Sequence, residues 1–221
     1  NDVAIWPRPV QQPHPPVWVP VTVSKETIEW AGRENIPITP GANANLAVMQ
    51  DMIRFYAECL AKNGHSITPD HMVLRANVYV ADNRQQAMKE AGPYTLYFFH
   101  TLFSHGSVSN VANQQSSGYR SESDYDYIRP ENREAFMGAL QSFRSMTLED
   151  LERNEQVCWG SPEEVRESLI TLADTVGGAT LLLNFNQGAM PHDMFVRNLQ
   201  RFGEEVLQAL QAHNVTTVPI A

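Results

Sequence analysis

One stretch of the sequence combines hydroxyl groups and a lysine with the junction between a strand-like run and a helix-like run. It extends from Thr22 to Thr27 and contains Ser24 and Lys25. A helix that begins here presents unpaired N–H groups and a partial positive charge, which suit a phosphate group. The hydroxyls add hydrogen-bond donors and the lysine adds a charge. The alternative is that Ser24 only caps the helix, as serine does at many helix starts.

Two further stretches place polar residues directly after an apolar run. They are TPGAN at 39–43, which begins with Thr39, and NFNQG at 184–188. In α/β proteins with parallel strands, ligands sit at the carboxyl ends of the strands, so both stretches are candidate binding loops. Ordinary loop chemistry is the alternative for both.

Motifs for other chemistry are missing from the sequence. The seven histidines show neither HxxxH nor HExxH spacing, so no sequence-local metal site is expected. The motifs GxSxG, GxGxxG and GxxxxGK[ST] are absent. Cys59 and Cys158 lie far apart, which favours free thiols in a reducing compartment and therefore a cytoplasmic protein.

The overall composition excludes several classes of partner. The 25 acidic residues outnumber the 16 basic ones and give a formal net charge of −9, so general nucleic-acid binding is not expected. No run approaches the roughly 20 apolar residues that span a bilayer. Residues 1–5 show no signal peptide, and the missing initiator methionine indicates a processed, trimmed or subcloned piece.

Hydrophobic patterning predicts alternating strands and helices. Ser161 and Glu164 form a capping-box pattern at the start of one helix, while Pro20 conflicts with a central position for the first strand because it has no N–H. Strands are expected at 17–23, 36–39, 72–82 and 179–185, and helices at 24–35, 45–63, from 83 towards 100, at 131–153, at 161–177 and from 190 onwards.

Two segments do not follow the alternation. Residues 1–16 are rich in proline and are expected to form an extended strap. Residues 104–130 are dominated by small polar residues without a period. This second segment is expected to be either a mobile lid-like loop or a mobile surface insertion.

Repeated βα units predict an α/β protein with a parallel sheet and helices packed outside it. The chain of 221 residues is long enough for one domain, residues 1–221. Only four βα units are visible, whereas a closed (β/α)₈ barrel needs eight. The sequence therefore predicts either half of a TIM barrel or a small open α/β sheet.

Three parts of the sequence together resemble the bacterial luciferase-like monooxygenase family. The first is RPVQQPHPPVWVPVTVSKETIEWAGRENIPITPG at 8–41. The second is WGSPEEVRESL at 159–169, which a glycine-bounded LLLNF run follows. The third is QGAMPHDMFVRNLQRFGEEVL at 187–207. The polar segment lies where that family carries its mobile active-site loop.

This resemblance implies a (β/α)₈ TIM-barrel type of which only the C-terminal four βα units are present, with a long insertion after the third strand. It implies oxidation of an organic substrate by O₂ and reduced FMN, or coenzyme F420 in some relatives. By resemblance, Thr22, Val23, Ser24 and Thr27 lie at the flavin phosphate, and Thr39 borders the flavin ring or the substrate. Val23 stands where some members have an acidic residue, so no polar side-chain contact is expected from it.

The catalytic residues are unknown and are expected in an N-terminal half that these 221 residues do not contain. A separate flavin reductase and a homodimer are further expectations from the resemblance. Two alternatives remain open: a half-barrel that binds flavin without turnover, and a half-barrel that only associates with another copy through its edge strands.

Overall fold

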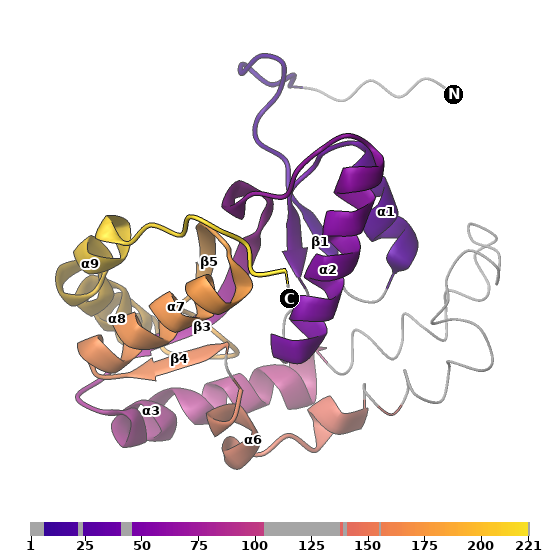
Figure 1. Cartoon of the computed structure of the whole chain (residues 1–221). Coiled ribbons are helices and arrows are strands. Elements are labelled where there is room, and N and C mark those ends of the chain that lie inside the picture. The colour runs from indigo at the N-terminus through magenta and orange to yellow at the C-terminus, as the bar shows by residue number, and fades with distance from the viewer. Residues whose placement is uncertain are drawn as a thin grey trace.

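The computed structural model describes residues 7–21, 24–40, 46–103, 138, 141–154 and 156–220. Strands and helices alternate along the chain (Figure 1). The strands are β1 (Val19–Val21), β2 (Ile38–Pro40), β3 (Val73–Val80), β4 (Val157–Gly160) and β5 (Thr180–Asn184). The helices are α1 (Lys25–Arg33), α2 (Leu46–Lys62), η1 (Pro69–His71), α3 (Arg84–Tyr97), η2 (Phe98–Phe103), α6 (Leu148–Glu152), α7 (Pro162–Val176), α8 (His192–Glu205) and α9 (Leu207–Ala212).

Local sequence signals explain where α7 begins and ends. The Ser161 side chain accepts a hydrogen bond from the Glu164 backbone N–H, and the Glu164 side chain accepts one from the Ser161 backbone N–H. This arrangement confirms the predicted capping box. The helix ends at Gly177, whose φ of 75° is a left-handed conformation that glycine adopts without strain.

All strand pairs are parallel, as the alternating pattern predicts. β1 pairs with β2, and β3 lies between β4 and β5 in a second sheet. A single bridge between Ile38 and Met72 connects β2 to the start of β3. β4 is a strand that the sequence pattern did not predict. The described residues therefore form an α/β fold with parallel strands and contain one strand more than expected.

The position of β1 resolves the conflict that Pro20 raised. The Val19 N–H donates to the Pro37 carbonyl at 3.0 Å, on the side where β2 lies. Backbone groups alternate along a strand, so the Pro20 nitrogen faces the opposite side. Among the described residues no strand pairs with β1 on that side. A proline at this edge therefore removes no hydrogen bond that the described sheet makes.

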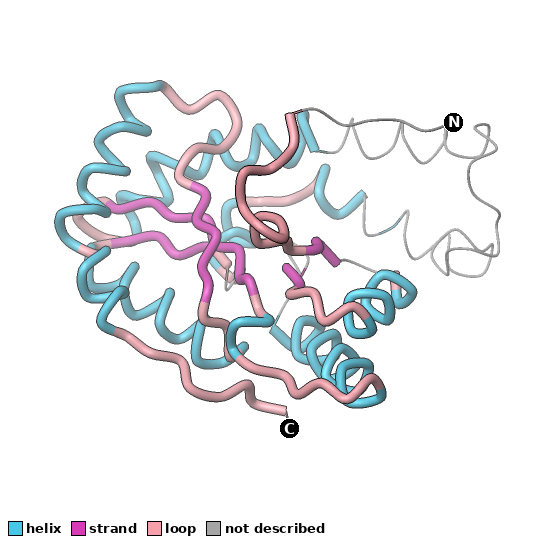
Figure 2. Tube along the Cα trace, turned by 90° about the horizontal axis from the view of Figure 1, so that it is seen from above, coloured by secondary structure: helices cyan, strands magenta, loops and turns pink. Residues whose placement is uncertain are grey.

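Two hydrophobic clusters cover different parts of the strands. The larger cluster joins Leu74 and Val78 of β3 to α1, α2, α7 and α8. The smaller cluster joins Tyr79 of β3 and Trp159 of β4 to α3 and α6. Figure 1 shows α7 and α3 on opposite sides of β4, and in the view of Figure 2 helices lie around the outside of the strands. The end of β3 is thus covered on both faces.

Several expectations concern parts of the chain that the structure describes only partly. Residues 7–16 of the strap contain no helix or strand and are mostly exposed. The lid-like segment at 104–130 lies outside the described residues. Of the helix expected at 131–153, the described portion contains α6. No helix within the described ranges is long and apolar enough to span a bilayer.

Candidate functional site

The structure brings Ser24 and Thr27 together at the start of α1. The Ser24 Oγ accepts hydrogen bonds from the Thr27 backbone N–H at 3.3 Å and from the Thr27 hydroxyl at 3.1 Å. It donates to the Glu26 carboxylate at 2.9 Å. Ser24 therefore caps α1, which is the alternative role that the sequence predicts for it. Thr22 lies outside the described residues, and so does Val23.

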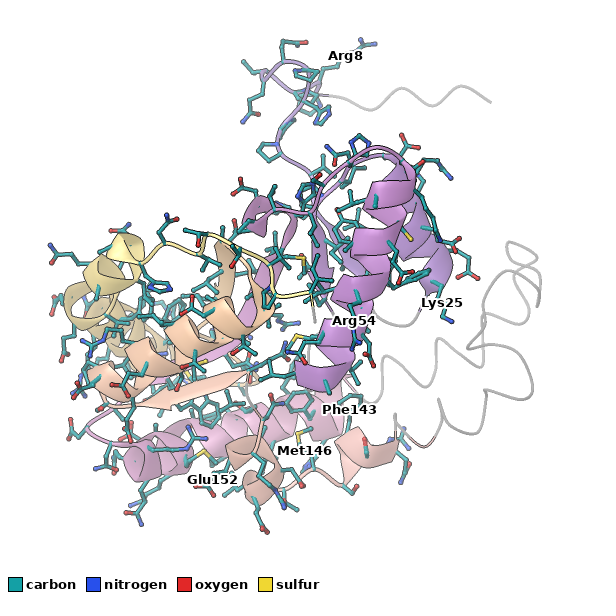
Figure 3. The ribbon with its side chains drawn as sticks, viewed as in Figure 1. Arg8, Lys25, Arg54, Phe143, Met146 and Glu152 are labelled. Atoms are coloured by element: carbon teal, nitrogen blue, oxygen red, sulfur yellow. The ribbon has the colours of Figure 1, made fainter. Side chains whose placement is uncertain are left out.

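The charges at this helix start are mixed. Lys25 is exposed and points away from the body of the protein (Figure 3). The Glu26 carboxylate accepts the hydrogen bond that the Ser24 hydroxyl donates. A bound anion that used this hydroxyl would have to displace the carboxylate, while the helix start and Lys25 would attract the anion. The site therefore offers two adjacent hydroxyls and a helix N-terminus, with Glu26 as a competitor.

Thr39 lies on the neighbouring strand at the same end of the sheet. Its Cα pairs with that of Pro20, and its neighbours Ile38 and Pro40 are buried. Because successive side chains alternate, Thr39 points away from the α1–α2 side, and it is only partly buried. The carboxyl ends of β1 and β2 meet at one edge, so Thr39 belongs to the same end of the sheet as Ser24.

Three amide side chains meet where β3 and β5 run side by side. Asn77 and Asn184 are Cα partners in the register of the two strands. The Asn77 Oδ1 accepts hydrogen bonds from the Asn184 Nδ2 at 3.3 Å and from the Gln187 Nε2. The loop at 184–188 is a candidate from the sequence, whereas Asn77 is not among the sequence candidates. The available signal was the alternation of Arg75 and Asn77 along one face of an otherwise apolar strand.

The Gln187 side chain is almost completely buried, with 6% exposed. Among the described residues, its Oε1 has no hydrogen-bond partner. A cavity of about 10 Å³ adjoins the amide cluster and is also lined by Thr95, Trp159 and Met190. This volume corresponds to about one water molecule, and a water there would satisfy the buried Gln187 oxygen.

Asn198 of α8 fixes the loop that follows β5. Its Oδ1 accepts from the Val80 N–H at 2.9 Å, and its Nδ2 donates to the Val78 carbonyl at 3.0 Å and to the Phe185 carbonyl at 3.4 Å. One side chain thus satisfies backbone groups at the end of β3 and at the start of the loop. The sequence does not predict this role, because Asn in an amphipathic helix normally faces water.

Tyr79 is a hydrogen-bond donor and not a titrating group. Its hydroxyl donates to the Glu90 carboxylate at 2.8 Å. Burial, and then the hydrogen bond to Glu90, raises the pKa of Tyr79 above its usual range. The phenol therefore stays protonated and holds β3 against α3.

The cysteines and His100 have structural surroundings. Burial raises the pKa of Cys158 to about 12 and also raises the pKa of Cys59, so neither thiol is activated as a nucleophile. The His100 Nε2 makes a hydrogen bond of 2.7 Å with the Met146 carbonyl, which connects η2 to the segment before α6. In the part of the chain that the structure describes, no three His, Cys, Asp or Glu residues gather in a metal-binding arrangement.

Solved structures with the same arrangement of elements are about twice as long as this chain. The monooxygenase RslO1 from Streptomyces bottropensis is 19% identical with a TM-score of 0.57, over 92% of this chain and 50% of its own. The oxygenating constituent of 3,6-diketocamphane monooxygenase from Pseudomonas putida, in complex with FMN, is 17% identical with a TM-score of 0.60, over 93% and 50%.

The coenzyme F420-dependent tetrahydromethanopterin reductase from Methanopyrus kandleri is 14% identical with a TM-score of 0.52, over 88% of this chain and 51% of its own. At these identities the similarity shows the fold alone, and this chain spans about half the length of each structure. No curated protein matches the chain. A family profile described as luciferase-like monooxygenase matches residues 1–178. The chain therefore belongs to the luciferase-like monooxygenase family.

Proposed function

We propose that this chain is the C-terminal half of a flavin-dependent monooxygenase that oxidises an organic substrate with O₂ and reduced FMN. Membership of the luciferase-like family supports an oxidoreductase. The observation that carries the cofactor assignment is the pair of hydroxyls, Ser24 and Thr27, at the start of α1. They lie at the carboxyl edge of parallel strands, where α/β enzymes bind their ligands.

The proposed architecture is half of a (β/α)₈ barrel, with its long insertion after β3. Parallel pairing of β1 with β2, the bridge from β2 to β3 and the pairing of β3 with β5 support it. The solved structures of similar fold are twice as long. The catalytic residues would then lie in the other half, and the segment 104–130 would act as the lid.

The residues at the start of α1 fit a flavin phosphate in number and type. The first-turn N–H groups, the Ser24 and Thr27 hydroxyls and the Lys25 ammonium would hold it, together with Thr22 and Val23. When bound, the reduced flavin supplies the reaction with O₂. The chain's own residues bind and orient it, and Thr39 borders its ring or the substrate. FMN is the first proposal and F420 the second, because one structure of similar fold is in complex with FMN and another is that of an F420-dependent enzyme.

The test compares FMN with riboflavin, which lacks the phosphate. We expect the wild-type chain to bind FMN more tightly than riboflavin in a fluorescence titration. The double variant Ser24→Ala with Thr27→Ala should weaken FMN binding about tenfold or more and leave riboflavin binding nearly unchanged, since only FMN uses the anion site. Ser161→Ala is the matched control, because it removes a helix cap elsewhere in the chain. Equal weakening of both flavins by the double variant would refute the phosphate role.

A second candidate function is a flavin-binding half-barrel without turnover. It is supported by the same pair of hydroxyls, Ser24 and Thr27, at the start of α1. It predicts bound flavin in the visible spectrum without substrate oxidation by the native gene product. A reducing cytoplasmic location is part of both proposals, supported by two free and buried cysteines. A separate reductase that delivers the flavin is part of the first proposal alone.

A further inference from the structure

The carboxyl end of β3 lies where the chain departs to opposite faces of its sheet. After β3 the chain enters α3, which packs on the face of Tyr79 and Ala81. After β5 it enters α8, which packs on the face of Val78 and Val80. β3 and β5 are neighbouring parallel strands. In open α/β sheets, the crevice between connections that leave neighbouring strands on opposite faces is the usual place for a ligand.

A cavity of about 230 Å³ occupies this crevice. Its walls come from the end of β3, from the start of α3 and from α8, so it is separate from the hydroxyl pair at the start of α1. Its charged lining residues are Asp82 and Glu90 on one side and Arg197 and Arg201 on the other. Pockets for drug-sized ligands measure about 300–1,000 Å³, so this cavity suits a molecule of about the size of an amino acid.

Glu90 lines the cavity with neutral partners alone. The Tyr79 hydroxyl donates to its Oε2 at 2.8 Å, and the Gln86 Nε2 donates to its Oε1. The Glu90 side chain is partly buried, and among the described residues it has no ion pair. The two donors hold the carboxylate in one place. A partly buried carboxylate of this kind favours a cationic group beside it.

Arg197 brings a positive charge to the same cavity without pairing with Glu90. Among the described residues its hydrogen bond runs from Nη1 to the Asp193 carboxylate at 2.7 Å, and the two side chains are 67% and 70% exposed. An exposed pair of this kind contributes little to stability, so a ligand carboxylate can replace Asp193. Arg201 already binds two carboxylates, at 3.0 and 2.8 Å. Arg197 is therefore the arginine of the cavity that is available to an anionic group.

We propose that this cavity binds a small zwitterion, such as a free amino acid, whose ammonium group contacts Glu90 and whose carboxylate contacts Arg197. Opposite charges that line one cavity without pairing are complementary to a molecule that carries both charges. Asn198 keeps the floor of the cavity in place, because it bonds the backbone of Val80 and Val78. The proposal goes beyond the flavin assignment and does not depend on it.

The experiment titrates the chain with zwitterions of graded length. Glycine, β-alanine and γ-aminobutyrate separate their two charges by increasing distances, and calorimetry measures their binding. We expect at least one of them to bind with a Kd of about 1 mM or below. Ethylamine and acetate each carry only one of the charges and should bind at least tenfold more weakly. The proposal is overturned if no zwitterion binds, or if none binds more tightly than ethylamine and acetate.

Two variants assign the binding to the cavity. Glu90→Gln removes the charge but keeps an acceptor for the Tyr79 hydroxyl, and it should weaken zwitterion binding at least tenfold. Arg197→Gln should weaken it as much, and its exposed position keeps the test decisive if Glu90→Gln does not fold. Glu163→Gln and Arg166→Gln are the matched controls, because these residues form a 3.2 Å ion pair on α7. Undiminished binding by a folded cavity variant overturns the proposal. The flavin titration reads out separately, because its variants lie at the start of α1.

Discussion

Replacing Asn198 with leucine tests how strongly one side chain holds the end of β3 and the loop after β5. Asn198 is 2% exposed, and leucine has a similar size, so the change leaves no large cavity. It leaves the Val80 N–H and the Val78 carbonyl without partners, as well as the weaker contact to Phe185. Each buried unsatisfied group costs about 1–3 kcal/mol, so the expected loss in the free energy of unfolding is about 2–6 kcal/mol.

Urea denaturation followed by circular dichroism measures this loss, and the expected shift of the midpoint is roughly 1–2 M. Asn63→Leu is the control, because Asn63 donates one hydrogen bond from an exposed position at the end of α2. Asn198→Asp adds a second readout. It keeps the acceptor for the Val80 N–H but places a carboxylate oxygen against the Val78 carbonyl. Because a protonated carboxyl group can donate to that carbonyl and an ionised one cannot, the substitution should be less destabilising at pH 5 than at pH 7. The reasoning is refuted if Asn198→Leu costs no more than Asn63→Leu.

Three further predictions concern packing, pH and thiol reactivity. A Cβ at Gly32 would lie 2.6 Å from the Cys59 Cβ, so Gly32→Ala should cost about 1–3 kcal/mol in thermal unfolding, whereas Gly203→Ala, with open space around it, should be neutral or stabilising. Burial lowers the pKa of His71, whose Nδ1 accepts a backbone N–H at 3.1 Å. The stability that the neutral His71 side chain contributes is present above the unfolded-state pKa of about 6.5. It is lost as the pH falls through the lowered pKa of the folded state. His71→Asn should flatten the difference in urea midpoints between pH 7.5 and pH 5.5, and an unchanged difference would contradict the assignment. Cys158 should react with a thiol reagent only after unfolding, and labelling of the native protein at neutral pH would show that the burial argument is wrong.

Local signals in the sequence predicted the regular parts of the fold. The capping box at Ser161, the glycine that ends α7 and the apolar period of α2 all depend on neighbours within a few residues, and the structure has each of them. β4 was missed because it has only four residues, VCWG, directly before the capping box. A run of that length has no readable period, and its pairing partner β3 is far away in sequence.

The same difference between local signals and distant contacts applies to the residues of the candidate site. Ser24 and Thr27 were found because a strand-to-helix junction is a local signal, and the structure joins their hydroxyls. Asn77 and Asn198 were missed because their roles depend on residues more than 100 positions away.

The arrangement of β3 between two late strands has a consequence for biosynthesis. Asn77 contacts Asn184, 107 residues further along the chain. At a synthesis rate of about 5–20 residues per second, this apolar strand leaves the ribosome roughly 5–20 s before its last partner. Until β4 and then β5 follow, edges of β3 are open to other nascent chains. Yield in cells should therefore respond to growth temperature and to chaperones that hold extended apolar segments.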